Sequence, residues 1–134
     1  MILKANSVKI MLIDSNTIYR KQLKEVLDNH IDETEVVSSL SETANVLTSL
    51  NKTPVDMILM DMPLYDINDI QLTKAIKKSH PEIVIIGIFT YLDYYRIRSL
   101  LKVGASQCID KGIDPIQLKH LFNYVPRLRK EQIN

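Results

Sequence analysis

Short apolar segments alternate with amphipathic segments along the whole chain. The apolar segments cover residues 8–13, 55–60 and 83–89, with weaker ones at 36–37 and 107–109. Their length and their aliphatic side chains are typical of buried β-strands. Between these segments, apolar residues recur every three or four positions, which predicts an amphipathic helix after each strand. The chain is therefore expected to contain five strand–helix units.

Several predicted helices carry residues that favour starting or stopping a helix. Ser41 is a candidate N-cap for the second helix, and Asp114 followed by Pro115 is a candidate start for the last one. The fourth helix is expected to include Leu92 and to end at Gly104, a candidate left-handed C-cap. These signals separate the helices from the strands.

The predicted strands are apolar on both faces, which is typical of a parallel sheet covered by helices on both sides. Right-handed crossovers then predict an α/β fold with a doubly wound, open sheet of five parallel strands and five helices. Ligands of such sheets bind beyond the carboxyl ends of the strands. We expect one domain over residues 1–125 and the start of a linker or tail over residues 126–134.

Composition narrows the class of protein. The 134 residues suit one domain. The single cysteine, Cys108, rules out an intrachain disulfide and favours the reducing cytoplasm. No apolar run approaches the ~20 residues of a membrane span, so no membrane partner is expected. The net charge of +1 combines 9 basic and 12 acidic residues over positions 1–90 with 8 basic and 4 acidic residues over positions 91–134. The chain as a whole is therefore not expected to attract nucleic acid.

Charged residues follow three of the predicted strands. Asp14 follows the first strand, Asp61 follows the third, and Lys111 comes just after the fifth. Because the carboxyl ends of parallel strands share one edge, two carboxylates and one ammonium group are expected to meet there. Clustered carboxylates need a balancing cation, which Lys111 supplies either alone or together with a hard ion such as Mg²⁺. Taken singly, Asp14 has an alternative as a helix cap and Lys111 as a surface lysine.

Three segments carry a resemblance to a known family: Lys-Ile-Met-Leu-Ile-Asp at residues 9–14, Asp-Met-Ile-Leu-Met-Asp at 56–61, and Val-Gly-Ala at 103–105 leading into Ile-Asp-Lys at 109–111. From residue 8 to about 125 the chain resembles the receiver domain of two-component response regulators. The resemblance implies a flavodoxin-like sheet with strand order 2-1-3-4-5. It also implies that Asp61 accepts a phosphoryl group from a histidine kinase or phosphotransfer protein, and that Lys111 pairs with the phosphate.

The resemblance places the metal positions at Asp14, Asp61 and Pro63. The chain departs from the family at Ser15, which stands where the family has a second acid that binds the metal. A hydroxyl is a poorer ligand for Mg²⁺ than a carboxylate. We therefore predict weak Mg²⁺ binding and slow or absent phosphorylation.

The switch positions of the family fall on Phe89, Thr90 and Cys108. Phe89 stands where a serine or threonine is usual, and it cannot donate a hydrogen bond to a phosphoryl oxygen. Thr90 could do so only if the register slips by one residue. Cys108 takes the place of an aromatic residue on the fifth strand. The switch is therefore expected to be impaired.

The resemblance leads to a predicted function in protein interaction. We expect a homodimer through the fourth helix, fifth strand and fifth helix, where aromatic residues and arginines suited to interface contacts gather. These residues are Tyr91, Tyr94, Tyr95, Arg96 and Arg98. Contact with nucleic acid is expected only through an attached DNA-binding output domain, as in a transcriptional regulator, and no enzyme activity is expected beyond self-phosphorylation at Asp61. The alternatives are a conventional Asp61 switch and a stand-alone receiver.

Two other classes with similar sheets fit less well. A haloacid-dehalogenase-type phosphatase needs a second aspartate two residues after the first, whereas Pro63 follows Asp61 and Asn16 follows Asp14. A flavin-binding domain needs a small, glycine- or hydroxyl-rich phosphate loop after the first strand. The sequence Ser-Asn-Thr at 15–17 supplies hydroxyls without glycine.

Overall fold

The computed structural model describes residues 7–29, 33–63, 68–91, 93–114 and 117–119. Strands and helices alternate along this part of the chain. In order they are β1 (Val8–Ile13), α1 (Thr17–Asn29), β2 (Thr34–Leu40), α2 (Val46–Lys52), β3 (Met57–Asp61), α3 (Asn68–Ser79), β4 (Val84–Phe89), α4 (Tyr94–Lys102) and β5 (Gln107–Asp110). Residues 117–119 are helical as well.

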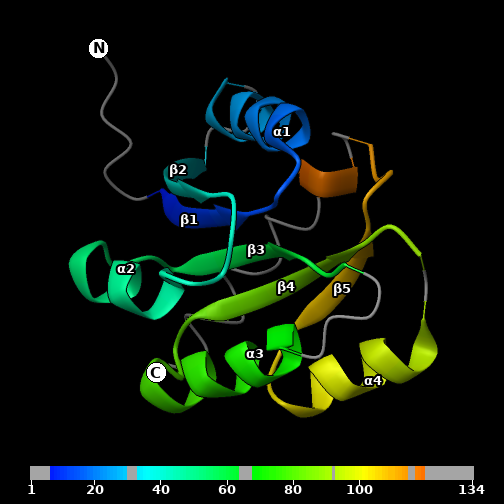
Figure 1. Cartoon of the computed structure of the whole chain (residues 1–134). Helices are drawn as coiled ribbons and strands as arrows, with labels where there is room; N and C mark the ends of the chain where they lie inside the picture. Colours follow the sequence, from blue (N-terminus) through cyan, green and yellow to red (C-terminus); the bar gives the residue numbers. More distant parts are fainter. Residues whose placement is uncertain (1–6, 30–32, 64–67, 92, 115–116, 120–134) are drawn as a thin grey trace.

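The five strands form one parallel sheet in the order β2-β1-β3-β4-β5. Helix α1 and the helical residues 117–119 lie on one side of this sheet, and α2, α3 and α4 lie on the other (Figure 1). The predicted doubly wound fold and its strand order are therefore confirmed.

Each face of the sheet has its own hydrophobic core. Alternate residues of a strand point to opposite faces, so Ile10 and Leu12 pack with Leu27 of α1, while Met11 and Ile13 belong to the core under α2, α3 and α4. Full burial of one such aliphatic side chain contributes roughly 1.5–3 kcal/mol. Strands that are apolar on both faces gain this energy only between two layers of helices, which explains the arrangement.

The predicted start of the second helix is wrong. Helix α2 begins at Val46 rather than after Ser41, and its N-cap residue Asn45 makes no side-chain capping hydrogen bond. Strand β2 extends to Leu40, so the next residues cross the carboxyl edge of the sheet as bends and turns. The Val46 N–H donates to the carbonyl of Thr43 at 3.3 Å within this crossing. Ser41 therefore belongs to the loop beside the candidate site.

Two other boundaries also differ from the prediction. Asp61 is the last residue of β3, where it pairs with Ile88, rather than the first residue after the strand. Helix α4 begins at Tyr94, and the Asp93 side chain caps it by accepting hydrogen bonds from the backbone N–H groups of Tyr95 and Arg96 at 3.0 and 3.3 Å. This N-cap was not predicted, although aspartate is among the preferred capping residues.

The ends of α4 and of the last helix agree with the sequence signals. Gly104 follows α4 with a positive φ of 119°, as expected of a glycine that ends a helix. The Asp114 carboxylate accepts a hydrogen bond from the Gln117 N–H at 3.0 Å, as expected of an N-cap. The predictions for Leu92, Pro115, the rest of the last helix and the tail at 126–134 fall outside the described residues. Within the described part of the chain, no helix is long and apolar enough to cross a membrane.

Candidate functional site

The carboxyl edge of the sheet brings together the three charged residues that the sequence singled out. Asp14 follows β1 and its N–H donates to the Leu40 carbonyl of β2 at 3.0 Å. Asp61 ends β3, and Lys111 follows β5 with its N–H donating to the Phe89 carbonyl of β4 at 2.8 Å. These backbone bonds anchor two of the three residues to neighbouring strands.

The three side chains form a buried charge cluster. The Nζ atom of Lys111 lies 2.8 Å from Oδ2 of Asp14 and 3.4 Å from Oδ1 of Asp61. The side chains of Asp14, Asp61 and Lys111 are 6%, 13% and 19% exposed. One ammonium group therefore bridges two carboxylates that are largely screened from solvent.

The electrostatic balance of the cluster raises the pKa of Asp61 above its usual value. Burial raises the pKa of Asp61, and the negative charge of Asp14 raises it further. The Coulomb attraction and hydrogen bond of Lys111 lower this pKa, as does the charge of Arg96, but the net direction is upward. Lys111 thus compensates only part of the cost of holding two carboxylates together.

Asp14 is held in place through both its side chain and its backbone. Its Oδ1 accepts a hydrogen bond from the Asn16 N–H at 2.8 Å, and the Arg20 guanidinium donates to its carbonyl oxygen. The same guanidinium donates to Oγ of Ser39 at 2.8 Å, which connects α1 to β2. Asn16 in turn caps the start of α1, because its Oδ1 accepts from the Tyr19 N–H at 3.0 Å.

Beside the cluster lies an acidic pocket of about 190 Å³. It is lined by Ile13, Asp14, Ser15, Ser41, Glu42, Thr43, Asp61, Pro63 and Asp69. Asp69 is only 2% exposed and comes from the first turn of α3. Asp69 was not predicted for the site, because its signal in the sequence was an acid at the start of a predicted helix. It reaches the pocket because the first turn of α3 lies there.

The residues of this pocket fit a hard divalent cation only in part. Carboxylate oxygens of Asp14 and Asp61, with the carbonyl of Pro63, are the kind of ligand that Mg²⁺ prefers. Ser15 is exposed and offers a hydroxyl instead of a carboxylate. Among the described residues, no group of three or more His, Cys, Asp or Glu side chains is arranged to hold a metal ion. The ammonium of Lys111 already contacts both carboxylates.

Two of the predicted switch positions, Phe89 and Cys108, lie on the neighbouring strands β4 and β5. Phe89 is the last residue of β4, is 1% exposed and belongs to the core on the α4 side. The absence of a side chain at Gly87 leaves room for it, since a Cβ there would lie 3.1 Å from the Phe89 ring. Thr90 is exposed just beyond the strand. Cys108 pairs with Gly87, is half-buried, and has its thiol pKa raised by burial to about 11.

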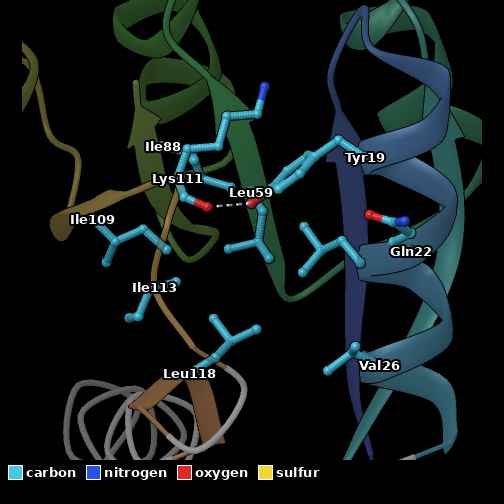
Figure 2. Close-up of a pocket in the computed structure, with 10 residues that line it drawn as sticks. Tyr19, Gln22, Val26, Leu59, Ile88, Ile109, Lys111, Ile113 and Leu118 are labelled. Carbon is cyan, nitrogen blue, oxygen red and sulfur yellow. Dashed lines mark hydrogen bonds between the residues drawn. The ribbon is translucent and has the colours of Figure 1, made fainter. Parts of the chain in front are cut away.

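Two residues near the site were not assigned to it from the sequence: Arg96 was expected only at an interface, and Tyr19 was not singled out. The Arg96 guanidinium of α4 lies 5.7 Å from the centre of the Phe89 ring and donates to the Met62 carbonyl at 3.5 Å. Tyr19 of α1 reaches the backbone and the side chain of Lys111 (Figure 2). Nothing in the sequence places either residue at the site, and only the packing of the helices shows that they reach it.

The fold and the charge cluster together place the protein in a class: α/β proteins with an open parallel sheet that carries acids and a lysine at its carboxyl edge. The sequence model of the family described as the response regulator receiver domain matches residues 10–123. The chain therefore belongs to the receiver domain family of two-component response regulators.

Relatives and solved structures agree with this assignment. The chain is 27% identical over 109 residues to the transcriptional regulatory protein DegU of Brevibacillus brevis, a match covering 81% of this chain and 46% of that protein. A CheY-like receiver domain protein from Methanospirillum hungatei matches with a TM-score of 0.81, 19% identity and coverage of 94% and 98% of the two chains. The receiver domain of the putative regulator NarL from Mycobacterium tuberculosis matches with a TM-score of 0.79, 16% identity and coverage of 93% and 98%. The chain spans about half the length of the curated relatives that it matches.

Proposed function

We propose that this receiver domain acts mainly through protein interaction, and that Mg²⁺-dependent phosphorylation of Asp61 is weak or absent. In this proposal Asp61 is the phosphoacceptor position and Lys111 the cation that pairs with it. The observation that carries the proposal is the contact of the Lys111 ammonium with both carboxylates, combined with Ser15 at the rim of the pocket.

Phosphoryl transfer depends on positioning and on neutralising the charge that develops on the phosphoryl oxygens. Mg²⁺, when bound by Asp14, Asp61 and the Pro63 carbonyl, would supply that neutralisation. With Ser15 in place of a carboxylate, the pocket offers the ion one negative charge fewer.

The proposed output is a fixed arrangement of the face formed by α4 and β5. Phe89 is packed in the core and cannot bind a phosphoryl oxygen from that position. Tyr94 and Tyr95 of α4 are 80% and 85% exposed, and large exposed aromatic side chains are favoured in protein interfaces. We propose that this face, extended by the last helix, forms a homodimer whether or not Asp61 is modified.

The same proposal includes the domain bounds, the partners and the location that are typical of the family. The receiver would occupy residues 1–125, with residues 126–134 beginning a linker or tail. Its partners would be a histidine kinase or phosphotransfer protein, in the cytoplasm. Nucleic acid would be contacted only through an attached DNA-binding output domain, for which the name of the matched transcriptional regulator is the support. The competing function is a conventional switch at Asp61.

One experiment separates the two functions. The protein is incubated with Mg²⁺ and acetyl phosphate, weighed intact, and analysed by sedimentation with and without the phosphodonor. We expect little or no added phosphoryl mass and the same dimer fraction in both samples, with Asp61→Asn as the control for modification elsewhere. Rapid stoichiometric addition at Asp61, together with a dimer fraction that changes with phosphodonor, would support the conventional switch instead.

A further inference from the structure

The ammonium group of Lys111 has a third contact besides the two carboxylates. Its Nζ lies 4.4 Å from the centre of the Tyr19 ring, well within the ~6 Å over which an aromatic face attracts a cation. Three groups thus surround one ammonium: Asp14, Asp61 and the ring of Tyr19. A lysine side chain has several rotatable bonds, and contacts on several sides restrict them.

Tyr19 is itself fixed by contacts on both ends. Its backbone N–H donates to the N-cap Asn16, and its hydroxyl donates to the Lys111 carbonyl at 3.5 Å (Figure 2). Its ring forms part of the wall of a largely apolar cavity of about 120 Å³, next to Leu59 and Ile88. Tyr19 and Lys111 therefore lie side by side in the wall of this cavity.

The Tyr19 ring also stays neutral. Burial raises the pKa of the phenol to about 12, and the charges of Asp14, Asp61 and Asp110 contribute to this rise. Throughout the neutral range the ring therefore presents an uncharged aromatic face to the lysine. Its attraction to the ammonium is then the quadrupole interaction of a neutral ring.

We propose that Tyr19 is a positioning residue of the charge cluster: its ring holds the ammonium of Lys111 against Asp14 and Asp61, so that the lysine keeps its bridging position between the two carboxylates. This inference rests on the proposed function, because it supplies a reason for weak Mg²⁺ binding. A divalent ion must compete with an ammonium that the ring keeps in place. Releasing the ammonium is then expected to favour the ion.

The test follows the ammonium group directly by ¹H–¹⁵N NMR of lysine side chains, without phosphodonor or Mg²⁺. Three variants are compared with the unmodified protein. Tyr19→Leu removes the ring and Tyr19→Phe keeps the ring but removes the hydroxyl. Ile18→Ala removes an exposed apolar side chain next to Tyr19 on α1 and is the matched control. Backbone amide spectra around Leu59 and Ile88 establish that each variant is folded, and Tyr19→Met replaces Tyr19→Leu if the latter does not fold.

We expect a resolved Lys111 ammonium signal with slow hydrogen exchange in the unmodified protein, in Tyr19→Phe and in Ile18→Ala. In Tyr19→Leu the exchange should be about fivefold faster, in line with the strength of a partly buried cation–π contact. A Mg²⁺ titration monitored by amide shifts should then show affinity about two- to fivefold tighter in Tyr19→Leu.

The inference is overturned if Lys111 exchanges equally fast with and without the ring. It is also overturned if Tyr19→Phe behaves like Tyr19→Leu, because the hydroxyl would then be responsible. Rapid phosphorylation of the unmodified protein would contradict the proposed function but not the role of Tyr19, because that measurement does not involve the Tyr19 variants.

Discussion

Removing the ammonium of Lys111 tests the charge cluster most directly. The change Lys111→Met keeps a side chain of similar length and keeps the backbone N–H that donates to the Phe89 carbonyl. It leaves the carboxylates of Asp14 and Asp61, which are 6% and 13% exposed, without their bridging cation. Buried charges of the same sign without a partner destabilise the folded state.

The distances set the size of the effect. At an effective dielectric constant of ~20, a pair at 2.8 Å attracts by about 6 kcal/mol and a pair at 3.4 Å by about 5 kcal/mol before desolvation is counted. Removing one partner of a fully buried pair costs about 3–5 kcal/mol in practice. Because Lys111 is 19% exposed, solvent screens part of the interaction, and we expect a loss of about 2–4 kcal/mol.

Urea unfolding at pH 7 measures this loss, with Lys119→Met as the control for an exposed lysine. That control should change the free energy of unfolding by less than about 0.5 kcal/mol. Without Lys111, one acid of the pair has its pKa raised further in the folded state than in the unfolded state. Lowering the pH from 7 towards 5 should therefore restore part of the lost stability, because the native state then binds a proton first. A variant within about 0.5 kcal/mol of the unmodified protein at pH 7 would refute the reasoning.

Two further predictions concern single residues, Cys108 on β5 and Gly104 just after α4. The thiol of Cys108, with its pKa raised from 9.0 to about 11, should react with iodoacetamide at pH 8 about 100-fold more slowly than an unfolded thiol, judged by thiolate content alone. The same raised pKa makes the free energy of unfolding fall as the pH rises from about 9 to 11, because the thiol of the unfolded chain loses its proton first. Equal rates of reaction with iodoacetamide in the native and the urea-unfolded protein would contradict the raised pKa. Gly104→Ala should lose about 1–3 kcal/mol in urea unfolding, because φ is +119° and the new Cβ would lie 2.8 Å from Cγ of Lys77. Gly112→Ala, at a glycine without a positive φ, should lose less, and equal losses would contradict the backbone argument.

Much of the fold can be predicted from the local periodicity of apolar residues. Residues 10–13 and 83–89 are apolar at successive positions, and this pattern requires cover on both faces of a strand. Boundaries were less predictable, as α2 shows. Ser41 is a good N-cap type, yet the pairing of β2 with β1 continues to Leu40, and the loop that follows must cross the sheet edge before a helix can begin. Strand pairing therefore overrides a local capping preference there.

The candidate site also has a part that could be predicted from the sequence and a part that could not. The sequence alone predicts the meeting of three charged residues, Asp14, Asp61 and Lys111, because the carboxyl ends of parallel strands lie at one edge of the sheet. Which atoms touch was decided by tertiary structure, since the placement of Tyr19, Asp69 and Arg96 depends on how α1, α3 and α4 pack over that edge. Periodicity specifies which side of a helix faces the sheet, whereas the reach of a side chain across two elements depends on their relative positions. The sequence thus determined the class of protein and its charged edge, and the packing of the helices determined how the lysine is held there.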